Sequence, residues 1–158
     1  MQPTRQTTPL ASPDATADLA HRIGATLEAG DVILLKGAIG AGKTHFARAL
    51  IQGILAFPED VPSPTFTLVQ VYDTTRGELW HADLYRLSST FELEELGLSQ
   101  AFCDAICLIE WPDRLGEDAP DTALWLSFSD GPDDQARLCT ATWSDPRWTS
   151  RLKGFLND

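Results

Sequence analysis

The sequence is poor in basic residues. Its 158 residues include 12 Lys and Arg against 23 Asp and Glu, which gives a formal net charge of −11 with His neutral. A protein that docks broadly on nucleic acid or on an anionic membrane needs a basic face to displace counterions. The composition therefore argues against such a surface, and any contact with phosphate groups is expected to be local.

Long apolar runs and paired cysteines are also scarce. No run approaches the roughly 20 residues that span a bilayer, and the first residues, MQPTRQTTPLASPD, lack the apolar core of a signal peptide. Cys103, Cys107 and Cys139 lie in apolar stretches, which predicts reduced, buried thiols. A zinc site at Cys103 and Cys107 is the alternative, although no second CxxC or His pair completes four ligands. We expect a cytoplasmic protein without a membrane partner.

The chain length suits one packed core. Residues 1–11 are polar and without period, so we expect a flexible arm followed by a single domain over residues 12–158. Ser12 and Pro13 predict the cap and first turn of an amphipathic helix that ends at Gly30. A capping box predicts a short acidic helix that starts near residue 89 and ends at Gly97, and Asp145 is expected to cap a last helix.

The strands are predicted from two kinds of pattern. Residues 31–36 and 105–109 are short apolar runs of the kind found in buried parallel strands. Alternating or β-branched segments predict a hairpin of residues 66–72 with 79–82, and further strands at residues 124–129 and 136–143.

The glycine-rich segment Gly37–Thr44, GAIGAGKT, fits G-x-x-x-x-G-K-[ST] between a predicted strand and a predicted helix. Glycines let successive N–H groups point at phosphate oxygens, and the helix N-terminus adds partial positive charge. Lys43 is expected to reach the β- and γ-phosphates, the Thr44 hydroxyl to ligate Mg²⁺, and the backbone of His45 to meet the α-phosphate. A glycine-rich turn without a ligand is the alternative. The segment predicts an α/β P-loop NTPase-like three-layer sandwich, with a mixed sheet that has a parallel core and antiparallel strands.

Two carboxylates follow predicted strands and are candidates for the catalytic centre. Glu110 ends the apolar run before it, at the edge where parallel sheets bind ligands, and could hold Mg²⁺ or orient water. Asp83 ends residues 79–82 and could serve the same metal. Ion pairs of Glu110 with Arg114 and of Asp83 with Arg86 are the structural alternatives.

Three further residues have open roles. Thr65, in a proline-stiffened loop, either senses a γ-phosphate or belongs to an ordinary strand entry. His81 is interpreted as a structural histidine rather than a base. Trp111 either covers the site or belongs to the core.

Four segments in order, GAIGAGKT, SPTFTLVQVY, HADLYRL and IEW, resemble the TsaE (YjeE) family of P-loop ATPases in tRNA threonylcarbamoyladenosine biosynthesis. The resemblance implies a Mg-dependent ATPase that works with TsaB and TsaD. It also implies that Asp83 supports metal or catalysis, and that the segment from Pro13 to Thr16 approaches adenine. The chain departs from the usual family sequence at Ala38-Ile39 and at His45, and these positions can act through their backbone atoms. The implied ATP contacts are Gly37, Gly40, Ala41, Gly42, Lys43, Thr44, His45, Thr65, Trp111 and Arg137, and the implied metal ligands are Thr44, Glu110 and Asp83.

Two other functions compete with this one. A small-molecule P-loop kinase usually closes a basic lid over the phosphoryl group, but residues 115–136 contain six acids and no Lys or Arg. A nucleotide-dependent assembly switch with incidental hydrolysis is the second alternative.

Overall fold

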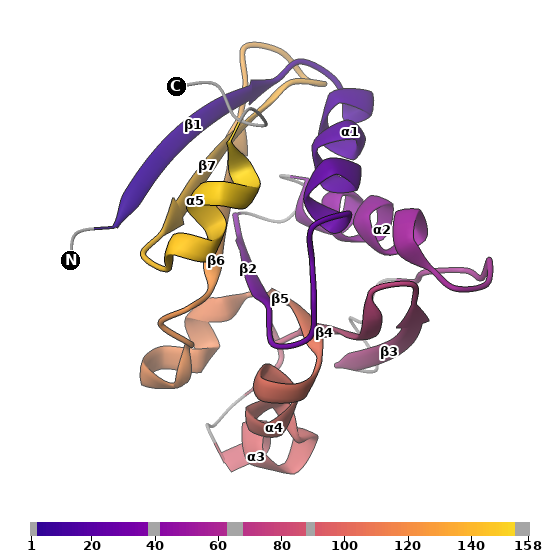
Figure 1. Ribbon diagram of the computed structural model, residues 1–158. Helices are drawn as coiled ribbons and strands as arrows, with labels where there is room; N and C mark the ends of the chain where they lie inside the picture. Colours follow the sequence, from indigo (N-terminus) through magenta and orange to yellow (C-terminus); the bar gives the residue numbers. More distant parts are fainter. Residues whose placement is uncertain (1–2, 38–41, 63–67, 88–90, 154–158) are drawn as a thin grey trace.

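The computed structural model describes residues 3–37, 42–62, 68–87 and 91–153. Within these residues, seven strands form one sheet in the order β1-β7-β6-β2-β5-β4-β3 (Figure 1). The strands are β1 Thr4–Leu10, β2 Val32–Lys36, β3 Val69–Thr74, β4 Gly77–Asp83, β5 Ile106–Glu110, β6 Leu124–Asp130 and β7 Arg137–Trp143.

The centre of the sheet is parallel and its flanks are antiparallel. Strand β2 pairs in parallel with β5 and β6, and β4 pairs in parallel with β5. Strands β1, β7 and β6 form one antiparallel flank, and the β3–β4 hairpin forms the other. All residues of β5 are buried, as a strand covered on both faces requires. The predicted mixed sheet with a parallel core is confirmed.

Helices cover both faces and produce the expected three layers (Figure 1). Ile33 and Leu35 of β2 pack into the apolar cluster that includes α1, α2 and α5. Val32 and Leu34 point the other way, into the cluster with α4 and η1. The helices are α1 Pro13–Gly24, α2 Lys43–Ile54, α3 Phe91–Leu96, α4 Leu98–Asp104, the 3-10 helix η1 Pro112–Asp118 and α5 Pro146–Leu152.

Two of the three helix caps predicted from sequence are confirmed, and the third, near residue 89, lies outside the described residues. The Ser12 hydroxyl accepts a bond from the Ala15 N–H at 3.2 Å, and the Asp145 carboxylate accepts one from the Arg147 N–H at 2.9 Å. Helix α1 nevertheless ends at Gly24 and not at Gly30. The chain tightens after Gly24, where the Thr26 N–H and hydroxyl both bond to the Ile23 carbonyl.

The expectation of a flexible arm over residues 1–11 is wrong. Residues Thr4–Leu10 form β1, which pairs with β7 along its whole length. Thr8 and Leu10 are buried while their neighbours face solvent, so a mostly polar strand is held by the hydrogen-bond ladder and a few inward side chains.

The region after the hairpin also differs from expectation. Gly97, with φ of 80°, ends α3 as predicted, but α4 begins immediately after it and buries Leu98 and Ala101. The sequence patterns did not predict α4, which is 7 residues long. The start of the predicted hairpin strand, Phe66, lies outside the described residues.

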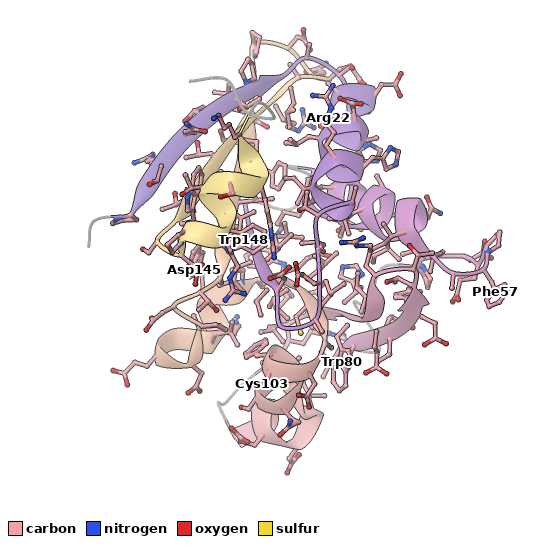
Figure 2. The ribbon with its side chains drawn as sticks, viewed as in Figure 1. Arg22, Phe57, Trp80, Cys103, Asp145 and Trp148 are labelled. Carbon is pink, nitrogen blue, oxygen red and sulfur yellow. The ribbon has the colours of Figure 1, made fainter. Side chains whose placement is uncertain are left out.

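The cysteines follow the prediction only in part. Cys107 and Cys139 are buried, and burial raises the pKa of each thiol to about 12. Cys103 is instead exposed on α4, near the lower edge of the molecule in Figure 2. Among the residues described, no group of three His, Cys, Asp or Glu side chains is arranged to hold a metal ion. None of the described helices is long and apolar enough to cross a membrane.

Candidate functional site

The described ends of the glycine-rich segment have the geometry of a phosphate loop. Strand β2 ends at Lys36 and α2 begins at Lys43. Gly37 and Gly42 have φ values of 144° and 108°, a region that side chains with a Cβ resist. The first turn of α2 has no acidic residue, so the partial positive charge of its N-terminus is available to an anion. Gly40 and Ala41, two expected ATP contacts, lie outside the described residues, as does Thr65.

Lys43 is a buried cation that has no hydrogen-bond partner among the residues the structure describes. The residue is 4% exposed, and within the described chain its Nζ has no donor or acceptor contact. The ammonium lies 3.7 Å from the centroid of the Trp111 ring. Burial lowers the pKa of the Lys43 ammonium, because the charges of Glu110 and Asp83 offset the lost hydration only in part. An anion arriving at this point would restore the missing interactions.

Glu110 lies at the end of β5 and joins α2 to β4. Its Oε1 accepts a hydrogen bond from the Thr44 hydroxyl at 2.8 Å, and its Oε2 lies 2.7 Å from His81 Nε2. The residue is 2% exposed. Burial opposes ionisation, but the bonds from His81 and Thr44 outweigh it and hold the pKa of the Glu110 carboxyl below its usual value. Two of the three residues predicted to hold Mg²⁺, Thr44 and Glu110, are therefore in direct contact.

Asp83 lies opposite Glu110 at the same edge of the sheet. Strands β4 and β5 are parallel, and Asp83 and Glu110 are register partners at their last positions. Asp83 is buried, and its Oδ1 accepts a bond from the Tyr85 N–H at 3.0 Å. One structural alternative was an ion pair of Glu110 with Arg114. The Arg114 guanidinium instead donates a hydrogen bond to the Tyr85 carbonyl oxygen at 3.2 Å. Both carboxylates thus face the beginning of α2.

Trp111 follows Glu110 in the left-handed backbone conformation, with φ of 59° and ψ of 53°. For a large side chain this conformation is strained. Its ring packs against Tyr85, with 4.8 Å between centroids, and against the Lys43 ammonium. Trp111 also packs against the apolar cluster that contains α4 and η1, so it both touches a predicted site residue and belongs to the core.

Two cavities open beside the first residues of α2. The cavity next to Lys43 has a volume of about 320 Å³ and is lined by Lys36, Gly37, Lys43, Trp111, Pro112, Asp113 and Ser127. The cavity next to Gly42 has a volume of about 260 Å³ and is lined by Pro13, Thr16, Gly42, His45, Asp134, Gln135 and Arg137. The second cavity brings together the beginning of α1, His45 and Arg137, which the sequence analysis had named separately.

His45 connects two of the helices that border this second cavity. Its Nε2 lies 2.9 Å from the Pro13 carbonyl oxygen, which ties the first turn of α2 to the first turn of α1. Asp134 and Gln135, which also line the cavity, were missed by sequence analysis because they belong to the turn between β6 and β7. Only their neighbour Arg137 indicated that this turn approaches the site.

The fold and site define an α/β protein of the P-loop nucleotide-binding class: a parallel strand, a glycine loop and a helix, with carboxylates at the ends of neighbouring strands. The family described as "Threonylcarbamoyl adenosine biosynthesis protein TsaE" matches residues 10–138. The chain belongs to this TsaE family.

Relatives and a solved structure agree with this assignment. The chain is 37% identical to the tRNA threonylcarbamoyladenosine biosynthesis protein TsaE of Rickettsia bellii over 142 residues, which cover 90% of this chain and 98% of that protein. It is 34% identical to the TsaE protein of Bacillus subtilis over 128 residues, or 80% and 79% of the two chains. The crystal structure of YdiB from Bacillus subtilis superposes with a TM-score of 0.79 at 27% identity, covering 98% of this chain and 96% of that one.

Proposed function

We propose that the protein is a Mg-dependent ATPase that acts with TsaB and TsaD in forming the threonylcarbamoyl group on N6 of the adenosine next to the anticodon of tRNA. The observation that carries the proposal is the 2.8 Å contact between the Thr44 hydroxyl and the Glu110 carboxylate. It lies beside the Lys43 ammonium, for which the described part of the chain supplies no hydrogen-bond partner. Membership of the TsaE family supports the pathway.

The donor set fits Mg²⁺ and a nucleotide. Mg²⁺ prefers hard oxygen ligands and usually takes only one or two from the protein, which Thr44 and Glu110 can supply from adjacent positions. Lys43 is a buried cation in need of an anion, and a phosphate chain is one. When bound, the metal would neutralise charge on the phosphates.

The residues of the chain divide the remaining work. Lys43 and the N-terminus of α2 bind and orient the terminal phosphates, so that charge developing on their oxygens meets fixed positive charge. Glu110, ionised and held by two hydrogen bonds, either holds the metal or orients the attacking water, and Asp83 supports it from β4. Trp111 covers Lys43 and excludes water from that side.

The cavity of about 260 Å³ beside Gly42 suits the base of the nucleotide. It adjoins the first turn of α2, where a phosphate chain would end, and its walls offer the apolar ring of Pro13 and the guanidinium of Arg137. An adenine ring can lie against both kinds of surface.

The proposal is tested by phosphate release from γ-labelled ATP with Mg²⁺ and with EDTA, in the presence of a panel of metabolites. We expect free phosphate with Mg²⁺ only. Label on a metabolite would identify a small-molecule kinase, and no Mg-dependent release, alone or with the partners, would contradict the ATPase.

The partners are tested by a pull-down with TsaB and TsaD, with and without ATP. The net charge of −11 argues that tRNA is reached through these partners and not by a basic surface of this chain. We expect retention of the protein on the partners. Failure to bind in both conditions would contradict this part of the proposal, and so would salt-sensitive tRNA binding by the isolated chain.

A further inference from the structure

His81 is buried near the edge of the sheet where Asp83 and Glu110 end their strands, although it lines neither of the two cavities. It is 1% exposed and lies on β4, two residues before Asp83. Side chains two apart on a strand share a face, so His81 and Asp83 both point toward the layer that contains α2. Glu110 reaches the same layer from β5, which explains how a histidine in the middle of one strand meets a carboxylate at the end of the next.

The two oxygens of Glu110 have different partners. Oε2 lies 2.7 Å from His81 Nε2, whereas Oε1 accepts the Thr44 hydroxyl at 2.8 Å. Because an ionised carboxylate only accepts, the His81 Nε2 must carry the proton in this contact. The bond fixes the rotation of the carboxylate about its last torsion angle, which is otherwise broad. The oxygen that remains then faces Thr44 and the beginning of α2.

The packing of β4 does not by itself call for a histidine here. Within the described residues, His81 Nδ1 is buried and has no hydrogen-bond partner. A leucine at this position would fill similar space without an unpartnered nitrogen, as Leu79 does two residues earlier on the same face. What a leucine would not provide is the bond to Glu110 Oε2.

We propose that His81 is a positioning residue that holds Glu110 Oε2 through its Nε2–H, so that Glu110 Oε1 and Thr44 present a ready pair of oxygens to the metal. This inference rests on the proposed function and extends it. It replaces the interpretation of His81 as a merely structural histidine. A ligand's outer partner of this kind typically changes metal affinity or activity by about 10- to 100-fold when removed.

The experiment compares three variants of His81 that differ in whether their side chain can place a hydrogen-bond donor near Glu110 Oε2. The amide of His81→Gln can occupy the position of Nε2 and keep the bond, whereas the amide of His81→Asn corresponds to Nδ1 and falls short. His81→Leu removes the donor. Leu79→Val is the matched control, because it perturbs the same face of β4 without touching Glu110. If His81→Leu does not fold, the comparison of Gln with Asn still decides the question.

Two readouts are measured for each variant: nucleotide affinity in EDTA, and the Mg²⁺ concentration that gives half-maximal ATP binding and turnover. For His81→Asn and His81→Leu we expect this Mg²⁺ concentration to rise about 10- to 100-fold, with affinity in EDTA unchanged. His81→Gln and Leu79→Val should stay close to the unsubstituted protein. A normal Mg²⁺ requirement in the Asn and Leu variants, or an equal loss in the Gln variant, would overturn the proposal.

A third readout does not depend on turnover. In a nitrogen-correlated NMR spectrum, the His81 Nε2 proton should be slow to exchange and shifted downfield, and Glu110→Ala should abolish both properties. An Nε2 signal that Glu110→Ala leaves unchanged would overturn the positioning role whatever the kinetics. Absence of any Mg²⁺ effect on the unsubstituted protein would instead contradict the proposed function, so the two failures are distinguishable.

Discussion

The two ends of the central parallel strands each bury a carboxylate, and the two carboxylates differ in their hydrogen-bond partners. Asp31, just before β2, is 1% exposed and is bonded by two guanidinium groups of α5, Arg147 at 3.1 Å and Arg151 at 2.5 Å. Glu110, at the end of β5, is 2% exposed, and within the described ranges its hydrogen-bond partners are a hydroxyl and an imidazole. Lys43, the nearby cation, has no hydrogen-bond partner among the described residues.

This difference in partners indicates that the carboxylate at the Asp31 end stabilises the fold, whereas the one at the Glu110 end is available for ligand binding. At the Asp31 end, opposite charges and hydrogen bonds satisfy one another, so the cluster fastens α5 to the sheet and leaves nothing for a ligand to complete. At the Glu110 end, a cation and a carboxylate are held near each other without a bond between them. This is the end where parallel sheets bind ligands.

The largest expected effect is on stability. Asp31→Ala removes the charged hydrogen bonds of two arginines of α5, which keep Asp145 and Glu28 as partners, and should lower the free energy of unfolding by about 3 kcal/mol. Urea denaturation measures it. Asp18→Ala removes an exposed pair with Arg22, 3.0 Å long on the surface of α1, and should change stability by less than about 1 kcal/mol. Equal effects of the two substitutions would contradict a fastening role for Asp31.

The next effect is on turnover. Glu110→Gln keeps the shape of the side chain but removes the charge, and should lower ATP turnover about 100-fold, which corresponds to about 2.7 kcal/mol of transition-state stabilisation. Nucleotide affinity should remain, because Lys43 and the α2 N-terminus are intact. Undiminished turnover in this variant would remove Glu110 from the catalytic centre. Full tRNA modification by a variant that does not hydrolyse ATP would favour the assembly switch.

Lys43→Met should have opposite effects on binding and on stability. The substitution removes a buried ammonium that finds no hydrogen-bond partner in the described ranges, so the free energy of unfolding should rise by about 0.5–2 kcal/mol. ATP affinity should fall about 10- to 100-fold, as expected for a lost charged contact. Calorimetric titration and urea denaturation measure the two effects. A less stable variant would show that Lys43 is already satisfied without a nucleotide.

The smallest effect concerns acid stability. Because the pKa of Glu110 lies below its usual value of 4.5, the folded protein keeps this carboxylate ionised where the unfolded chain already binds a proton. The stability that Glu110 contributes is therefore complete above about pH 4.5 and lost as pH falls through the folded pKa. The free energy of unfolding, measured as pH falls below about 4.5, should depend less steeply on pH in Glu110→Gln than in the unsubstituted protein. Identical slopes would contradict the lowered pKa.

The sequence predicted the Glu110 end far better than the Asp31 end. Glu110 and Asp83 could be placed because each ends an apolar run, and the glycine motif marked the strand beside them. The family resemblance implied that Thr44 and Glu110 hold one metal ion, and the structure places their side chains in direct contact.

Several features that the sequence did not predict depend on pairings between distant segments. Nothing local in residues 4–10 indicates a strand, since its partner β7 lies more than a hundred residues away. Asp31 meets Arg147 and Arg151 only when α5 docks, and His81 meets Glu110 only through the register of β4 with β5. Such contacts are set by tertiary packing and leave no periodic pattern in the chain.

The central claim is that the Glu110 end binds the nucleotide and the Asp31 end does not. Adding Mg·ADP to isotopically labelled protein and following the amide signals by NMR tests it most directly. We predict that the shifts concentrate at residues 42–46, at Glu110 and Trp111, and around Arg137, while the signals of Asp31 and α5 stay in place. Shifts centred on Asp31 and α5, with residues 42–46 unaffected, would contradict the account.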